Sequence, residues 1–277
     1  MNPRESARPQ SPAAICATAV GLVAQITWLD FVRRKDLYVV AMLMGLFVLA
    51  AVAVRIFGLG EGAQAAATAR FLMSGGLALA HVLAAFLAAS FCGRAFPEEM
   101  ERGTLMPLLA KPVSRGQVLA GKALACLGMA VGAYLLFVVL TVLAVPTVPG
   151  QRWTALGQAV VLQSVGIALL GMLAMALSLY LPSVVAALAA LLWYFGAGLA
   201  IQILGAATAG RWAGAAALLE RLWGALPDPG LLNHSECFAE SSLRLDWTLF
   251  AVLLAYGLGW TALLTLWARA RLERIRL

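Results

Sequence analysis

Residues 94–122 read RAFPEEMERGTLMPLLAKPVSRGQVLAGK, and they separate two apolar runs that are each long enough to cross a membrane. Pro97 suits the first turn of a helix, where its missing N–H would have no intrahelical partner. Negative side chains near a helix start are favoured by the helix dipole, and the next acidic residues are Glu98, Glu99 and Glu101. Gly103 can end this turn. A short helix starting at Pro97 is therefore predicted.

The second half of the same loop carries its own start and stop signals. Thr104 can cap another short helix that runs through Leu109, and Pro112 breaks the chain again. Ser114 and Gln117 have the spacing of a capping box, which predicts the start of the next long helix. The loop is therefore predicted to be a helix, a break and a second helix at the membrane surface, a shape suited to docking.

The composition of the chain places it in a membrane. Hydrophobic residues make up 62% of it, charged residues only 12%, and the mean hydropathy is +0.89. A helical span needs roughly 20 apolar residues. The runs that reach this length are residues 37–57, 71–92, 118–145, 156–181, 183–204 and 247–268. The predicted fold is an all-α membrane protein with six transmembrane helices.

The distribution of Lys and Arg predicts the orientation of these spans. With both termini inside, the inner segments carry fourteen basic residues: Arg4, Arg8, Arg33, Arg34, Lys35, Arg94, Arg102, Lys111, Arg115, Lys122, Arg269, Arg271, Arg274 and Arg276. The outer segments carry six: Arg55, Arg70, Arg152, Arg211, Arg221 and Arg244. This excess predicts cytoplasmic termini in a cell (inner) membrane. It also explains the net charge of +7 without nucleic-acid binding, for which the chain has little soluble surface.

The chain is predicted to divide into an N-terminus, a membrane domain and a tail. Residues 1–12 are polar and expected to be disordered, and residues 13–36 are expected to form an interfacial helix with apolar residues toward lipid. The six-span domain covers residues 37–268 and includes an extracytoplasmic amphipathic segment at 205–246. Residues 269–277 form a basic cytoplasmic tail.

The loop also resembles a known family. The pattern consists of Glu99-x-Glu101-x-Gly103-Thr104-Leu105, then Leu108-Leu109-Ala110-x-Pro112-Val113-Ser114-Arg115, and Gly121-Lys122. It is similar to the cytoplasmic loop of type-2 ABC-transporter permeases, especially the branch linked to multi-copper enzyme maturation. The order of the apolar runs and the segment Trp28-Leu29-Asp30-x-x-Arg33-Arg34-Lys35 also fit this family.

The resemblance implies a permease subunit of an ATP-driven exporter, which works with a separate ABC ATPase and with a second permease copy or paralogue. It implies a coupling helix that contacts the ATPase through Pro97, Glu98, Glu99, Glu101, Arg102, Gly103, Thr104, Leu105, Pro112 and Arg115. The N-terminal interfacial helix corresponds to the elbow helix of the family, with Trp28, Asp30, Arg33, Arg34 and Lys35 among membrane lipids.

The chain lacks the motifs of an enzyme. Residues 116–123 approach a phosphate-binding loop, but Ala123 stands where Ser or Thr must reach magnesium, and the segment opens a membrane helix. ATP and magnesium are therefore expected on the partner ATPase, with no cofactor in this chain. The segment His234-Ser235-Glu236-Cys237 lacks the spacing of a metal site, and no metal is expected.

A few polar residues inside the predicted spans remain open to two interpretations. They are His81, Gln158, Gln163 and Gln202, and they either join helices by hydrogen bonds or line a substrate path. Gly128 and Gly132 have the spacing of a close helix contact. The alternatives to an exporter are an ATPase-independent secondary transporter or channel, and a membrane anchor or assembly factor. Ion-driven carriers usually place carboxylates within spans, and these spans have none beyond the boundary residue Asp246.

Overall fold

The computed structural model describes residues 12–58, 63–101, 114–146, 153–208, 227–233 and 246–274. The regular elements in these ranges are all helices. In chain order they are α1 (Pro12–Val32), α2 (Lys35–Phe57), α3 (Ala63–Arg94), α4 (Pro97–Glu101), α6 (Arg115–Ala144), α7 (Trp153–Leu177), α8 (Ser183–Thr208), the 3-10 helix η1 (Pro229–Leu232) and α11 (Trp247–Arg274). The predicted all-α membrane fold is confirmed.

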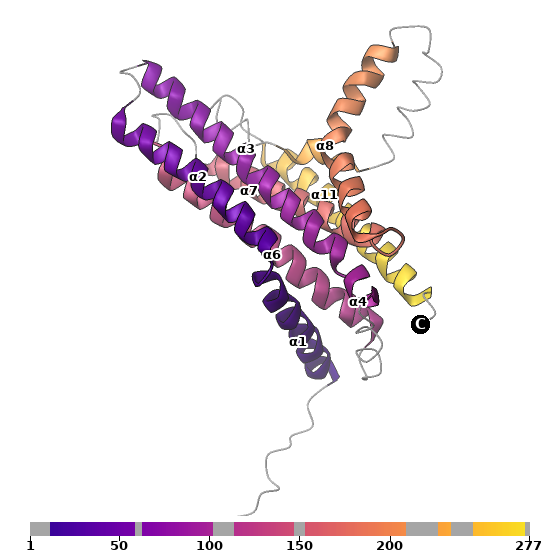
Figure 1. The fold of residues 1–277 in the computed structure, drawn as a ribbon. Coiled ribbons are helices and arrows are strands. Elements are labelled where there is room, and N and C mark those ends of the chain that lie inside the picture. Colours follow the sequence, from indigo (N-terminus) through magenta and orange to yellow (C-terminus); the bar gives the residue numbers. More distant parts are fainter. Residues whose placement is uncertain are drawn as a thin grey trace, which may run out of the picture.

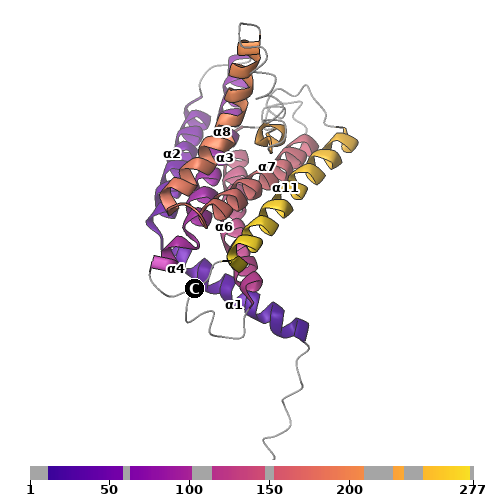
Figure 2. The ribbon, with the colours of Figure 1, turned by 90° about the vertical axis from the view of Figure 1, so that its right-hand side faces the viewer.

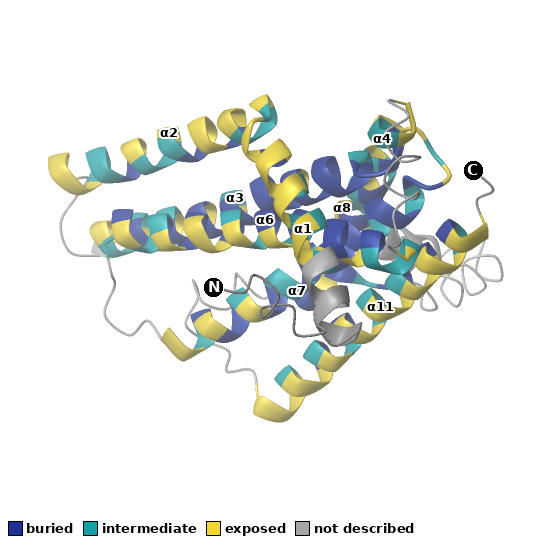
Figure 3. Ribbon diagram, turned by 90° about the horizontal axis from the view of Figure 1, so that it is seen from below, coloured by how far each residue is buried: buried dark blue, intermediate teal, exposed yellow. Residues whose placement is uncertain are grey.

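The long helices form one bundle in which α2, α3, α6, α7, α8 and α11 run alternately up and down, while α1 leads into α2 from below (Figure 1). Helices α1 and α4, the start of α6 and the C-terminal end of α11 gather at the same end of this bundle (Figures 1 and 2). Helices α3, α6 and α7 carry most of the buried residues, whereas α2 and α11 lie at the edges with long exposed faces (Figure 3). The edge helices therefore present their apolar faces outward.

Five helices among the described residues are long and apolar enough to cross a membrane: α2, α3, α6, α7 and α11. The remaining predicted span, residues 183–204, falls on α8, which has 26 residues and whose side chains are described as far as Gly196. The turn between α7 and α8 takes only residues 178–182.

Most helix boundaries differ from the predicted ones by a few residues, and three of the differences change how the chain is organised. The N-terminal helix ends at Val32, and Arg34 adopts an extended conformation before α2 begins at Lys35, so the predicted 13–36 segment contains a break. Helix α3 begins at Ala63 rather than residue 71, because the preceding alanine-rich turns have high helix propensity although they lack large apolar side chains. Helix α11 continues to Arg274, so most of the predicted tail is helical.

Residues 227–233, a described part of the predicted extracytoplasmic segment, enter the bundle. Leu232 is fully buried, and a Cβ at Gly257 of α11 or Gly166 of α7 would lie 3.3 or 3.6 Å from its side chain. The backbone at 227–228 bonds to side chains: the Trp193 indole donates to Pro227 O at 3.3 Å, and Asp228 N donates to Tyr256 Oη at 2.8 Å. Irregular backbone needs such partners within a membrane bundle. The predicted amphipathic residues 209–226 and residues 234–245 lie outside the described part.

Candidate functional site

Helix α4 follows α3 after a two-residue turn, and this turn fixes its position. Phe96 and Pro97 are buried, and the N–H groups of Glu99 and Met100 donate to Phe96 O at 3.2 and 3.0 Å. The helix therefore begins at Pro97, as the sequence predicts. Because its first residues are buried against the bundle, α4 is packed firmly on the end of α3.

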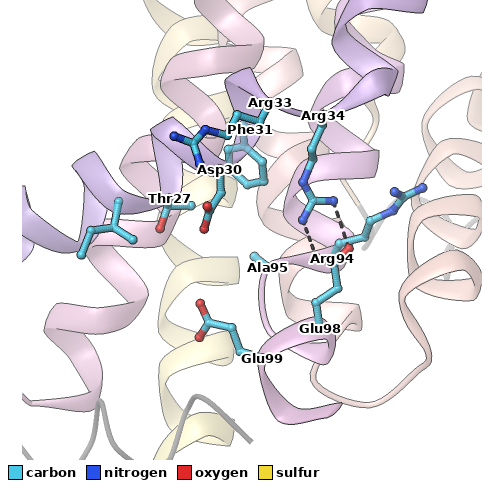
Figure 4. A pocket seen from close by; sticks show the side chains of 10 residues that line it. Thr27, Asp30, Phe31, Arg33, Arg34, Arg94, Ala95, Glu98 and Glu99 are labelled. Atoms are coloured by element: carbon cyan, nitrogen blue, oxygen red, sulfur yellow. Dashed lines mark hydrogen bonds and ion pairs between the residues drawn. The ribbon is translucent and has the colours of Figure 1, made fainter. Parts of the chain in front are cut away.

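Glu98 joins α4 to the break between α1 and α2. Its carboxylate accepts two hydrogen bonds from Arg34, with a distance of 3.0 Å between Nη1 and Oε1 (Figure 4). The Arg34 guanidinium also lies 5.2 Å from the centroid of the Phe31 ring, which stacks on Phe91 of α3 at 4.5 Å. A bidentate Arg–carboxylate pair restricts orientation as well as distance. Glu98 therefore fixes α4 to the elbow.

Glu99 joins α4 to α6 through Lys122. The lysine side chain is only 1% exposed, and its Nζ lies 2.5 Å from Glu99 Oε2 and 2.5 Å from Ala95 O. The same ammonium lies 4.4 Å from the centroid of the Phe96 ring. A buried charge needs such partners to offset its desolvation. Lys122 thus ties the start of α4 to the membrane helix that follows the loop.

A third ion pair joins α2 to α3 at the same level. The Arg94 guanidinium lies 3.1 Å from Asp36 Oδ2, and the hydroxyl of Ser90 donates to the same oxygen at 3.3 Å. Both ends of the loop are therefore held, because the next helix is fixed as well: Arg115 Nη1 donates to Leu272 O of α11 at 2.9 Å. The junction consists of Arg34, Asp36, Arg94, Glu98, Glu99 and Lys122, and we call it the coupling junction.

The remaining residues predicted for coupling fall into two groups. Met100 and Glu101 are exposed at the end of α4, so they form the part of this helix that is free for a partner. Arg115 begins α6, and the predicted capping box of Ser114 and Gln117 is confirmed there. The others lie outside the described residues; they are Arg102, Gly103, Thr104, Leu105 and Pro112.

The elbow residues have different surroundings from one another. Trp28 is 42% exposed and borders Gly128 of α6, where a Cβ would lie 3.5 Å from its ring. Asp30 and Arg33 line a cleft beside α4, while Lys35 is exposed at the first turn of α2. Arg34 alone of this group belongs to the coupling junction.

Sequence reasoning missed Asp36 and the role of Lys122. A lysine near the end of an apolar helix usually reaches toward solvent, whereas Lys122 is buried and paired with Glu99. The neighbouring Gly121 packs against α1, where a Cβ would lie 2.9 Å from Val20 O. Gly121 and Lys122, which gave the segment its likeness to a phosphate-binding loop, therefore serve as a helix contact and as one member of an ion pair. An isolated charge in an apolar run was the available signal for Lys122.

The predicted pathway residues lie in the core of the bundle. His81 of α3 and Gln163 of α7 contact each other through Nδ1 and Nε2, and both are buried. The His81 ring lies 5.5 Å from the Tyr194 ring of α8. Gln158 is also buried and has a partner of its own, while the side chain of Gln202 lies outside the described part. His81 and Gln163 thus join α3 to α7, with α8 alongside.

The His81–Gln163 contact predicts unequal effects of removing its two members. Gln163 Oε1 is buried and has no hydrogen-bond partner among the described residues. His81→Leu would leave the whole amide without a partner, and we expect a loss of about 1–2 kcal/mol of stability. Gln163→Leu leaves His81 Nδ1 without a partner but also removes the unpartnered oxygen, so it should cost less, about 0.5–1 kcal/mol. Thermal unfolding in detergent measures the stability of both variants. A greater loss for Gln163→Leu than for His81→Leu would contradict a hydrogen bond from the Gln163 amide to His81.

Comparison with known proteins agrees with this architecture. The chain matches the family described as ABC-2 family transporter protein over residues 22–265, a range that begins within α1 and ends within α11. A comparison with curated proteins finds no match. The family match includes the second half of α1, the coupling junction, α2 through α8 in full and most of α11. The chain therefore belongs to the ABC-2 transporter family, as a membrane-spanning permease subunit of an ABC transporter.

Proposed function

We propose that this permease couples a separate ABC ATPase to the export of a substrate, with α4 and the following loop as the docking element. Two permeases, identical or paralogous, form the pathway. ATP and magnesium are held by the ATPase, and this chain supplies no catalytic residue. The protein lies in the cell (inner) membrane with both termini cytoplasmic, which the excess of Lys and Arg at that end supports.

The observation that carries this proposal is the way α4 is fixed. Glu98 pairs with Arg34 and Glu99 pairs with Lys122, so the two glutamates attach α4 to the elbow and to α6. Only the far side of the helix, with Met100 and Glu101, is exposed. A push on that side would be transmitted to α3, to α6 through Lys122 and to the start of α2 through Arg34, because packed helices move as rigid bodies. This arrangement suits a lever that an ATPase moves.

The exposed side of α4 supplies the test. Glu101→Lys reverses a charge on the docking face without touching the coupling junction, and we expect about tenfold less ATPase to co-purify with the permease. Glu273→Lys makes the same charge change on an exposed residue of α11 at the same end of the bundle, and co-purification should remain unchanged. Pull-down with the tagged permease measures both variants.

Two results would count against the proposal. Equal losses for the two variants would show a general charge effect, and no loss for Glu101→Lys would remove α4 as the docking element. Substrate movement by purified permease in vesicles without any ATPase would favour a secondary transporter instead. An assembly factor would show no substrate-stimulated ATP hydrolysis in the reconstituted complex.

A further inference from the structure

A cleft of about 560 Å³ opens between α1 and the junction of α3 with α4. Its volume lies within the range of roughly 300–1,000 Å³ that is usual for small-ligand pockets. The lining combines an apolar side chain, Ile26, with both signs of charge from Asp30, Arg33 and Glu99. Such mixed lining at the membrane-surface end of a bundle suits an amphiphilic ligand.

Most of the charges around this cleft neutralise each other, and a few remain. Arg34 pairs with Glu98, and Oε2 of Glu99 pairs with Lys122. Among the described residues, Asp30 and Arg33 make no hydrogen bond or ion pair, and both are exposed. Oε1 of Glu99 likewise has no hydrogen-bond partner within the described ranges. The cleft therefore offers a free carboxylate, a free guanidinium and a second carboxylate oxygen.

These groups are arranged on two sides of the same space. The carboxylates of Asp30 and Glu99 face each other across it, from α1 and α4, and Arg33 lies three residues beyond Asp30 (Figure 4). On the outer side of α1, large apolar residues are exposed to the surroundings: Leu22 and Ile26 at 55% and 58%, and Leu29 at 54%. A bound molecule would thus lie between two carboxylates, next to the Arg33 guanidinium and beside an apolar helix face.

The geometry points to a phospholipid with a primary-amine headgroup, of the phosphoethanolamine type, as the occupant of this cleft. Its ammonium donates hydrogen bonds to Asp30 and to Oε1 of Glu99, and its phosphate accepts from Arg33. Its acyl chains lie along the apolar side of α1 near Ile26. This assignment rests on the interfacial position of α1, and it is independent of how the ATPase docks.

A series of lipids with stepwise methylated amines tests the headgroup. Each added methyl removes one N–H donor, from phosphatidylethanolamine through its mono- and dimethyl forms to phosphatidylcholine, while the phosphate and the charge stay the same. The full chain in detergent is titrated with each short-chain lipid, and binding is measured as the shift in thermal unfolding temperature. We expect affinity to fall along the series, by about tenfold or more from first to last.

Two variants separate the roles of the cleft residues. Asp30→Asn should weaken the binding of phosphatidylethanolamine about tenfold, because a neutral amide is a poorer acceptor for an ammonium. The affinities for the lipids of the series should then become similar. Arg33→Gln should weaken the binding of every lipid by about tenfold, because all of them carry the phosphate. The fall in affinity from phosphatidylethanolamine to phosphatidylcholine should stay the same. Asp246→Asn and Arg70→Gln make the same chemical changes on exposed residues away from the cleft. They should change neither the affinities nor their fall along the series.

Several outcomes would overturn the assignment. A flat series with the unaltered chain would exclude recognition of the amine, and an unchanged slope in Asp30→Asn would place the site elsewhere. Glycerophosphoethanolamine, which lacks acyl chains, should compete poorly; equal competition would indicate a soluble ligand instead of a lipid.

Discussion

Glu99→Leu is expected to destabilise the protein by about 2–3 kcal/mol, a larger loss than that from Lys122→Met. The reason is the unequal exposure of the two partners, 1% for the lysine side chain and 35% for the glutamate side chain. Removing Glu99 leaves an ammonium buried between Ala95 O and the Phe96 ring without its counter-charge. Removing Lys122 leaves a carboxylate that water still reaches, so Lys122→Met should cost about 1 kcal/mol.

The double variant Glu99→Leu/Lys122→Met completes the test. With both charges gone, an apolar contact replaces the pair, and such replacements are often neutral or better. The double variant should therefore be more stable than Glu99→Leu alone, by about 1–2 kcal/mol in the thermodynamic cycle. Thermal unfolding of the purified permease in one detergent gives all four values. If the double variant is the least stable of the four, Lys122 is held by other contacts and the ion pair is not what keeps α4 in place.

The same junction shows which part of the site could be predicted from the sequence. The start of α4 at Pro97 and the capping box of Ser114 with Gln117 depend on residues within one turn of each other, and local patterns identify such features. Pairing between Arg34 and Glu98 joins residues 64 positions apart, and no local pattern specifies it. The sequence therefore predicted where α4 begins, but not that two of its glutamates face the bundle.

The segment at 227–233 shows a second limit of sequence reasoning. Pro227, Pro229 and Gly230 are typical of a break in the chain, and the segment forms only a four-residue 3-10 helix, Pro229–Leu232. Its burial depends on Gly166 and Gly257, which leave room for Leu232, and on Trp193 and Tyr256, which bond to its backbone. These four residues are spread over three helices, so only the packed bundle reveals the site.

The spacing of two glycines in α6 predicts a close helix contact, which the described part of this chain does not show at the second glycine. Gly128 and Gly132 have the spacing of a close helix contact, yet a Cβ at Gly132 would meet nothing within 4 Å among the described residues. The close approach lies at Gly121 instead, where a Cβ would lie 2.9 Å from Val20 O and 2.9 Å from Val23 Cβ. A motif shows that two helices can approach closely, but it does not show which glycine meets a neighbour.

This difference predicts opposite effects of the same substitution at two positions of one helix. Gly121→Ala should destabilise the protein by about 1–3 kcal/mol, because the new methyl group meets the α1 backbone, which cannot turn away as a flexible side chain can. Gly132→Ala should stabilise the protein by about 0.5–1 kcal/mol, because alanine loses less backbone freedom in a helix and the space is open.

Unfolding temperatures of the two variants, measured side by side, decide this prediction. A fluorescent probe on α1 adds a second readout, because displacement of α1 by Gly121→Ala should increase the mobility of the probe, whereas Gly132→Ala should leave it unchanged. Destabilisation by both variants to the same extent would mean that Gly132 meets a surface outside the described residues, such as a second permease. Stabilisation by both would show that α1 does not rest on α6 at Gly121, and the elbow could then transmit no movement through that contact.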